Sequence, residues 1–271
     1  MQAEPIRAAL AQAHEHWIHT PQGDIYAQSW EPVECAHSAP VILFHDSLGC
    51  VALWRDFPAA LAAATGRRVI AYDRLGFGRS AVHPGGWSAA FIREEAERWF
   101  PELLAGLGID RFIALGHSVG GAMAVCCAAI HADRCEAVIT VAAPTRVDAG
   151  MVKGLREAQQ AFREPGQIER LARYHGDKAA WVFAAWIDTW LSEDFAGWRI
   201  AQVAPELRCP LLVVHGDQDE YGSPEHPRDI IKLAQGSSEL LILEGCHHVP
   251  HRECPERLIA AVSRFLSAHL P

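Results

Sequence analysis

Six short and almost wholly apolar runs recur along the chain, and stretches with helical spacing separate most of them. The runs occupy residues 41–44, 68–72, 112–115, 137–141, 211–214 and 240–243, and a further run at 24–30 alternates between apolar and polar residues. Runs this short and apolar are typical of strands inside a parallel sheet, and helical patterns such as those at 119–130 and 255–269 supply the crossovers. The sequence therefore predicts an α/β fold, with helices on both faces of a mostly parallel sheet.

Length and charge restrict the setting in which such a fold works. The chain has 271 residues and a net charge of −9, and no apolar run approaches the roughly 18–20 residues that a membrane helix needs. Its first residues lack the apolar centre of a secretory signal. We therefore expect a cytoplasmic monomer or homodimer that acts on a small molecule and binds neither nucleic acid nor membrane.

Histidine and cysteine are abundant, with 15 and 8 residues, which raises the question of a metal site. No C-x-x-C pair is present, so the sequence contains neither a zinc ribbon nor a dithiol redox motif. His247, His248 and His251 lie close together, but Pro250 prevents the regular helix that would place two histidines on one face. We expect all eight thiols, Cys35 among them, to be reduced packing residues, and we expect neither a metal nor any other cofactor.

Residues 144–205 interrupt the alternation, because they have helical spacing but no convincing strand. This segment carries no net charge, so the negative charge belongs to the remainder, and it is rich in tryptophan: Trp181, Trp186, Trp190 and Trp198. A long insertion between two strands is typical of a functional lid. The sequence thus divides into a body of residues 1–143 and 206–271 and a helical lid of residues 144–205, with one or two tryptophans expected to face a pocket.

The sequence Gly116-His-Ser-Val-Gly120 matches the pattern G-x-S-x-G, which by itself is weak evidence. Its position is informative, because it lies directly between an apolar strand and a helical run. A nucleophilic serine on a sharp strand-to-helix turn needs small flanking residues, and Gly121 adds a third glycine. We therefore predict Ser118 as a nucleophile.

A serine nucleophile needs a base, and on such a sheet the acid and then the base should follow later strands in chain order. Residues 215–220 follow one strand and offer Asp217 and Asp219. Residues 244–253 follow the next strand and offer His247, His248 and His251. Both segments lie where a catalytic acid and base are required.

Together with these motifs, the segment Asp73-Arg-Leu-Gly-Phe-Gly-Arg-Ser80 makes the chain resemble the α/β-hydrolase superfamily from about residue 24 to the end. The resemblance implies about eight strands in the sheet and selects Asp219 as the acid and His248 as the base. Some members of the family carry the acid after an earlier strand, which here would be Asp148. With Ser118 these residues would form a Ser-His-Asp triad.

The resemblance also implies an oxyanion hole built from the backbone N–H groups of Val119 and Ser47. This chain departs from the family there, since Asp46 follows His45 where a glycine is usual. A carboxylate beside a developing negative charge is unfavourable unless it points away or is paired. The other histidines near the motifs, His45, His117 and His215, are expected to support loops through hydrogen bonds.

A serine nucleophile favours acyl transfer to water over the chemistry of the family's aspartate branches. We expect a small, largely apolar ester, thioester or lactone as the substrate. The residues expected to line its pocket are His117, Leu48, Trp181, Trp186, Trp190 and Val249. Two alternatives are hydrolysis of a C–C bond in ring-cleavage products and a catalytically silent ligand-binding protein.

Overall fold

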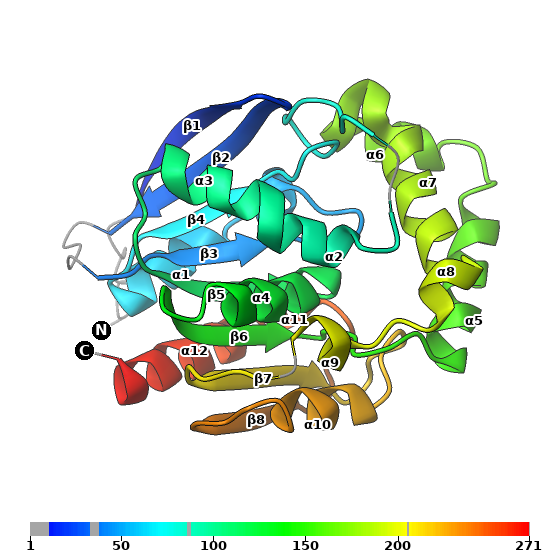
Figure 1. The fold of residues 1–271 in the computed structure, drawn as a ribbon. Helices are drawn as coiled ribbons and strands as arrows, with labels where there is room; N and C mark the ends of the chain where they lie inside the picture. Colours follow the sequence, from blue (N-terminus) through cyan, green and yellow to red (C-terminus); the bar gives the residue numbers. More distant parts are fainter. Residues whose placement is uncertain (1–10, 33–37, 86–87, 205, 271) are drawn as a thin grey trace, which may run out of the picture.

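The structure is a computed structural model that describes residues 11–32, 38–85, 88–204 and 206–270. Within these residues, eight strands form one sheet in the order β1-β2-β4-β3-β5-β6-β7-β8 (Figure 1). The strands are β1 (Gln12–Thr20), β2 (Gly23–Glu31), β3 (Val41–Phe44), β4 (Val69–Tyr72), β5 (Phe112–His117), β6 (Cys135–Val141), β7 (Leu211–Gly216) and β8 (Ser238–Leu243). The pairs β1–β2 and β2–β4 are antiparallel and the others are parallel, which confirms the predicted sheet.

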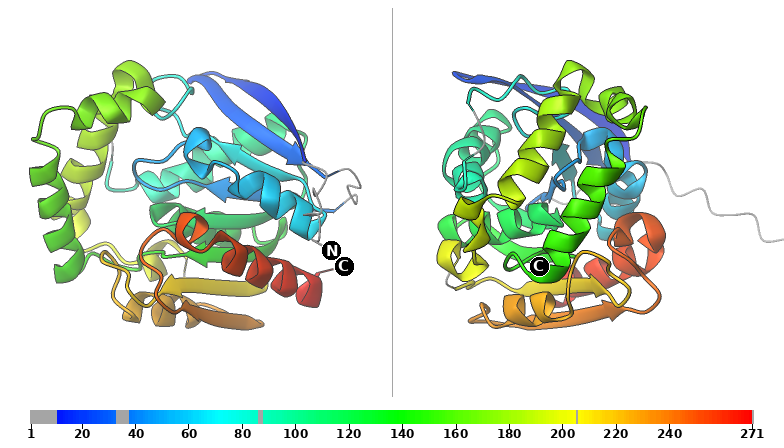
Figure 2. Two further views of the ribbon diagram at one scale, coloured as in Figure 1. Left: turned by 180° about the vertical axis from the view of Figure 1, so that it is seen from behind. Right: turned by 90° about the vertical axis from the view of Figure 1, so that its right-hand side faces the viewer.

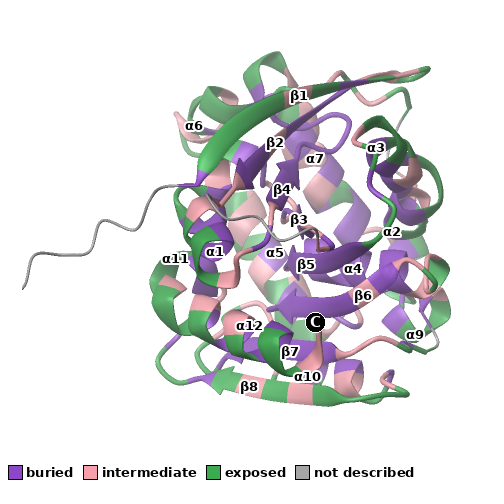
Figure 3. Cartoon of the chain, turned by 90° about the vertical axis from the view of Figure 1, so that its left-hand side faces the viewer, coloured by how far each residue is buried: buried purple, intermediate pink, exposed green. Residues whose placement is uncertain are grey.

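Helices cover both faces of this sheet, and the alternation of side chains along each strand explains why. In β3, Val41 and Leu43 join one apolar core, whereas Ile42 and Phe44 join another. The first core lies under α1 (Phe57–Thr65) and α12 (Pro255–His269), which Figure 2 shows from behind. The second lies under α2 (Phe91–Glu94), α3 (Phe100–Gly106) and α4 (Val119–Ile130). The central strands are therefore buried on both faces (Figure 3).

The sequence does not predict β1, because this strand is mostly exposed and polar. It forms an edge of the sheet, and its register with β2 pairs Trp17 with Tyr26. Three of the histidines, His14, His16 and His19, lie on it. Part of the histidine surplus thus belongs to an exposed edge strand.

Residues 144–204 form helices and contribute no named strand. They comprise α5 (Ala149–Ala161), α6 (Gln167–His175), a short 3₁₀ turn (Gly176–Lys178), α7 (Ala179–Trp190), α8 (Glu193–Ala196) and α9 (Ile200–Val203). Helices α5 to α8 stand at the end of the sheet where the parallel strands finish (Figure 1). The predicted end of this insertion, residue 205, lies outside the described residues.

Contacts on both sides hold these helices against the rest of the chain. His175 of α6 accepts a hydrogen bond from the Gly78 N–H at 2.8 Å and donates one to the Leu48 carbonyl at 3.0 Å. At the other side, Arg146 forms ion pairs with Glu225 and Asp229 of α10 (Glu225–Ile231). The helical segment is therefore tied to the loops that follow β3 and β4 and to α10.

Seven cysteines lie within the described residues and carry free thiols, whereas Cys35 lies outside them. Across the same part of the chain, no helix is both long enough and apolar enough to cross a bilayer. No group of three or more histidine, cysteine or acidic side chains among the described residues is arranged to hold a metal ion.

Candidate active site

Ser118 lies on a sharp turn between β5 and α4. Its φ angle of 54° falls in the left-handed region, which strains any residue that has a Cβ atom. Glycines make the turn possible, because a Cβ atom added at Gly116 would lie 2.0 Å from the Gly120 carbonyl oxygen. A Cβ atom added at Gly120 would lie 2.1 Å from the Phe44 carbonyl oxygen. The turn has the geometry of a nucleophile elbow and presents the Ser118 hydroxyl at the end of the sheet.

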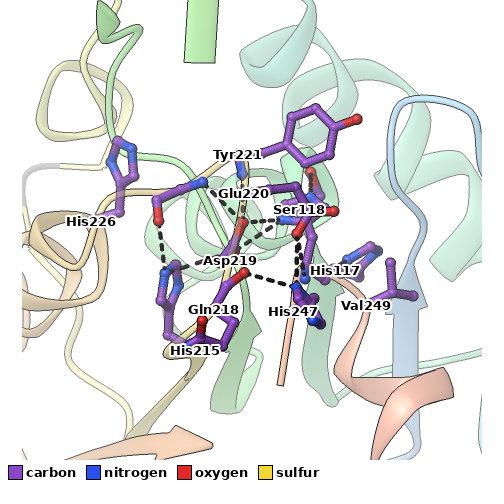
Figure 4. Close-up of polar contacts among 12 residues, drawn as sticks. His117, Ser118, His215, Gln218, Asp219, Glu220, Tyr221, His226, His247 and Val249 are labelled. Atoms are coloured by element: carbon purple, nitrogen blue, oxygen red, sulfur yellow. Dashed lines mark hydrogen bonds and ion pairs between the residues drawn. The ribbon is translucent and has the colours of Figure 1, made fainter. Parts of the chain in front are cut away.

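Hydrogen bonds link Ser118 to His248 and His248 to Asp219. Ser118 Oγ lies 3.1 Å from His248 Nε2, and His248 Nδ1 lies 2.9 and 3.0 Å from the two carboxylate oxygens of Asp219. Because a carboxylate only accepts, Nδ1 carries the proton, and the lone pair on Nε2 of the neutral ring faces the serine hydroxyl. The structure thus brings together the three residues selected from the sequence, which follow β5, β7 and β8. Figure 4 labels Ser118 and Asp219 among them.

The surroundings of Asp219 keep it ionised. Its side chain is only 1% exposed, and it accepts backbone hydrogen bonds from Tyr221 and Gly222, each at 2.9 Å. Burial raises the pKa of Asp219. The hydrogen bond and charge of His248, with the Tyr221 N–H, lower it by more, so the pKa falls below its ordinary value. Asp219 is therefore a carboxylate that can orient and stabilise a histidine.

Pairing with Asp219 raises the pKa of His248. Burial alone lowers this pKa, but the hydrogen bond and negative charge of Asp219 outweigh it, with help from Asp46 and Glu220. The pKa of His248 therefore lies above its ordinary value of 6.5. A histidine with this pKa is suited to exchanging a proton near neutral pH.

The rival acids and bases have other partners. Asp217 accepts a hydrogen bond from the Gly245 N–H at 2.7 Å, and Asp148 caps α5 and lies 3.2 Å from His226. His247 is exposed and bonds to the Gln218 carbonyl at 3.0 Å. His251 is buried against Trp54, at 4.6 Å between ring centroids.

The predicted oxyanion donors lie beside Ser118. Val119 is the first residue of α4, so its N–H group has no acceptor within the helix. Ser47 lines the same cavity as Ser118. Asp46 is paired as its position requires, because it accepts hydrogen bonds from the Leu48 N–H at 2.8 Å and from His117 Nδ1 at 3.3 Å.

The segments that follow β3, β5, β7 and β8, together with the helices α5 and α7, line a cavity of about 190 Å³ that includes Ser118 in its wall. Of the residues predicted to line it, His117, Leu48, Trp186, Trp190 and Val249 do so. Further lining residues that the sequence did not indicate are Met151 and Leu155 of α5 and Tyr221, Ala142, Pro144 and Gly222. The wall is therefore mainly apolar and aromatic.

Trp181 does not line this cavity. Its ring packs edge-on against Phe77 at 5.8 Å and stacks on His83 at 5.5 Å, and it covers Gly76 so closely that a Cβ atom there would lie 2.2 Å away. On α7, Trp186 and Trp190 are four residues apart and share one face, whereas Trp181 is five residues before Trp186 and points elsewhere. Two of the four tryptophans of the insertion thus face the cavity.

Nothing in the sequence indicates that Tyr221, Met151 and Leu155 line the cavity. The Tyr221 ring, labelled in Figure 4, lies 4.9 Å from the His248 ring between centroids, and a Cβ atom added at Gly154 of α5 would lie 3.2 Å from it. The tyrosine follows the acid by two residues, so only the fold of the loop shows that it turns back over the histidine. Met151 and Leu155 are separated by four residues on one face of α5, a spacing that fits any buried helix.

Comparisons with known proteins agree with this architecture. A model of the alpha/beta hydrolase fold family matches residues 39–186. The human serine hydrolase BPHL is 27% identical over 194 residues, which cover 69% of this chain and 66% of the human protein. The chain thus spans just under two thirds of that relative's length.

Solved structures are similar over almost the whole chain. Proline iminopeptidase from Mycobacterium smegmatis gives a TM-score of 0.72 at 22% identity, covering 94% of this chain and 98% of that protein. A serine hydrolase involved in carbazole degradation, the CarC enzyme, gives a TM-score of 0.73 at 20% identity, covering 95% and 100%. At such identities the likeness concerns the fold alone.

The chain belongs to the alpha/beta hydrolase fold family.

Proposed function

We propose that this protein is an enzyme, a serine hydrolase that cleaves a small, largely apolar carboxylic ester, thioester or lactone. The observation that carries the proposal is the hydrogen-bonded series Ser118, His248 and Asp219, of which Ser118 and His248 line an apolar cavity. A serine hydroxyl becomes a competent nucleophile when a neutral imidazole accepts its proton. The nucleophile position at the elbow holds a serine and not an aspartate, so acyl transfer fits better than the hydrolysis of haloalkanes or epoxides.

The mechanism follows from which atoms face each other. His248 Nε2 takes the Ser118 proton as Oγ attacks the carbonyl carbon, and Asp219 stabilises the imidazolium that results. The imidazolium then protonates the departing alcohol, thiol or ring oxygen, which leaves an acyl group on Ser118. Water attacks this acyl group, gives its proton to His248, and releases the acid as Ser118 recovers its proton.

Negative charge develops on the carbonyl oxygen during both attacks. In this proposal the backbone N–H groups of Val119 and Ser47 bind that oxygen, and each such donor contributes roughly 3 kcal/mol to catalysis in related systems. Residues 144–205 would act as the lid, because α5 and α7 supply much of the cavity wall, and residues 1–143 and 206–271 would form the catalytic body.

The cavity limits the acyl group that can bind. For comparison, an apolar protein cavity of about 150 Å³ holds one benzene molecule, so a space of about 190 Å³ suits a short or cyclic group. Trp186, Trp190, Met151 and Leu155 offer it apolar contacts. The net charge of −9 disfavours polyanionic substrates as well.

A series of nitrophenyl esters tests this substrate class. We expect kcat/KM to be highest for acyl chains of about two to six carbons and to fall at least about tenfold by twelve carbons, because longer chains exceed the cavity. A vinylogous diketone measured beside the esters reports C–C hydrolysis. Faster turnover of the diketone, or rising rates up to twelve carbons, would contradict the proposed substrate class.

The raised pKa of His248 predicts the pH dependence. The protonated imidazole cannot accept the Ser118 proton, so activity is lost as pH falls through the pKa of His248. Since Asp219 holds that pKa above 6.5, the acid side of the kcat/KM profile should have its midpoint above pH 6.5. A profile that stayed level down to pH 5 would rule out His248 as the base.

A further inference from the structure

His117 forms a bridge between the oxyanion loop and the loop that carries His248. Its ring lies at the end of β5, directly before Ser118, and is 2% exposed. Nδ1 lies 3.3 Å from Asp46 Oδ2, and Nε2 lies 2.7 Å from the backbone carbonyl oxygen of His248. One buried side chain thus contacts both loops that must be placed correctly around the nucleophile.

The two partners of His117 fix its protonation. A carbonyl oxygen accepts hydrogen bonds but cannot donate one, and the same holds for an ionised carboxylate. Both ring nitrogens therefore face acceptors, and a neutral imidazole could satisfy only one of them. Only a ring with a proton on each nitrogen, an imidazolium, donates to both the Asp46 carboxylate and the His248 carbonyl.

We propose that His117, as this buried imidazolium, is a positioning residue that neutralises Asp46 and fixes the His248 loop relative to the oxyanion loop. The proposal rests on the serine-hydrolase function, since it concerns the same oxyanion and base. It also explains how this chain carries Asp46 where glycine is usual. Alone, a carboxylate on the cavity wall would oppose the negative charge of the tetrahedral intermediate; paired with a cation, it does not.

Other contacts of Asp46 agree with an ionised, fixed side chain. Burial raises the pKa of Asp46, but the hydrogen bond and charge of His117, with His45 and the Leu48 N–H, hold it well below its ordinary value. The backbone carbonyl of Asp46 is held as well, by Arg74 Nη2 at 2.8 Å and by His45 Nδ1 at 2.8 Å. Turning the carboxylate away from His117 would break its bond to the Leu48 N–H, and moving the loop would break the two bonds at the carbonyl.

The field at His248 comes from titratable groups on several loops. The groups that act on His248 or His117 are Asp46 after β3, His251 after β8, and four from the end of β7 onward: His215, Asp219, Glu220 and Tyr221. The rings of His117 and His248 are 5.1 Å apart between centroids. A change of charge on His117 at that distance alters the protonation of His248, and so does a change on Asp46, whose negative charge raises the pKa of His248.

A double-mutant cycle tests the proposal through kcat/KM measured against pH. His117→Gln leaves the Asp46 charge uncompensated, so we expect a loss of about 10- to 100-fold and a shift of the acid limb by about 1 unit to higher pH. Asp46→Asn should stay within about threefold of wild type, because neutral His117 can then accept from the asparagine amide and still donate to the His248 carbonyl. The double variant should regain about tenfold over His117→Gln and return the acid limb to its wild-type position.

Rescue distinguishes this role from simple packing. If His117 only filled space, removing a second contact would add to the damage, so a double variant no more active than His117→Gln would overturn the proposal. An acid limb of His117→Gln that did not move would overturn it as well. His247→Gln provides the matched control, because this exposed histidine of the same loop contacts neither Asp46 nor Ser118.

Nitrogen-15 spectroscopy of the ring gives a readout that does not depend on activity. In wild type, both nitrogens of His117 should show directly bonded protons, and in Asp46→Asn only one should. A neutral wild-type ring would overturn the proposal even if every variant folded and turned over substrate. Labelling of Ser118 by a fluorophosphonate reports separately on the hydrolase function, so failure of one can be told from failure of the other.

Discussion

Ser118→Ala is expected to abolish hydrolysis, with a loss of about 10⁴-fold or more in kcat and no labelling by a fluorophosphonate probe. The reason is that Ser118 Oγ is the atom that His248 Nε2 faces at 3.1 Å. Alanine keeps the Cβ atom that the strained turn already accommodates at φ 54°, so the variant should fold. Probe labelling followed by mass measurement, and turnover of the best nitrophenyl ester, measure the two effects.

The control for this substitution is Ser267→Ala. Ser267 is an exposed serine on α12, on the far side of the sheet from the elbow, and should label and turn over like wild type. Equal labelling of Ser118→Ala and wild type would refute the nucleophile. Absence of labelling in the wild type itself would instead favour a ligand-binding role for this fold.

The positions of Ser118, Asp219 and His248 could be predicted because the sequence signals for them are local or follow chain order. A strand, a glycine-flanked serine and a helix appear side by side in the sequence from 112 to 130, and the structure places β5 and α4 there. The acid and base each follow a short apolar run, and parallel strands bring the ends of such runs to one edge of the sheet. Choosing Asp219 over Asp217 and His248 over its neighbours depended on the family resemblance.

What the sequence could not supply depends on contacts between distant segments. The pairing of Asp46 with His117 joins residues 71 positions apart, and the position of Tyr221 against His248 depends on how one loop turns. The polar strand β1 is held by its pairing with β2 and not by burial, so apolar patterning does not show it. The prediction that Trp181 lines the cavity is wrong, and helical spacing alone places Trp181 on a different face of α7 from Trp186 and Trp190.

His248→Gln should cost about 10⁴-fold or more in kcat, whereas His247→Gln should stay within about twofold of wild type. Glutamine at 248 can donate its amide hydrogens to Asp219 and so satisfy the buried carboxylate, but it cannot accept the serine proton at neutral pH. His247 is 61% exposed, and its contact with the Gln218 carbonyl can be replaced by a glutamine amide. The comparison therefore isolates proton transfer from the polarity and folding of the loop.

The same pair of variants separates the base from a loop that is merely sensitive to change. Both substitutions introduce the same side chain at adjacent positions, so a general disturbance of the loop would lower both activities alike. Equal losses, or a larger loss for His247→Gln, would remove His248 from the proposed mechanism. Because burial of the Asp219 carboxylate is tolerated through its bonds to His248 and two backbone N–H groups, both variants should keep a melting temperature within a few degrees of wild type. A large drop in kcat for His248→Gln at an unchanged melting temperature then assigns the loss to the missing proton acceptor.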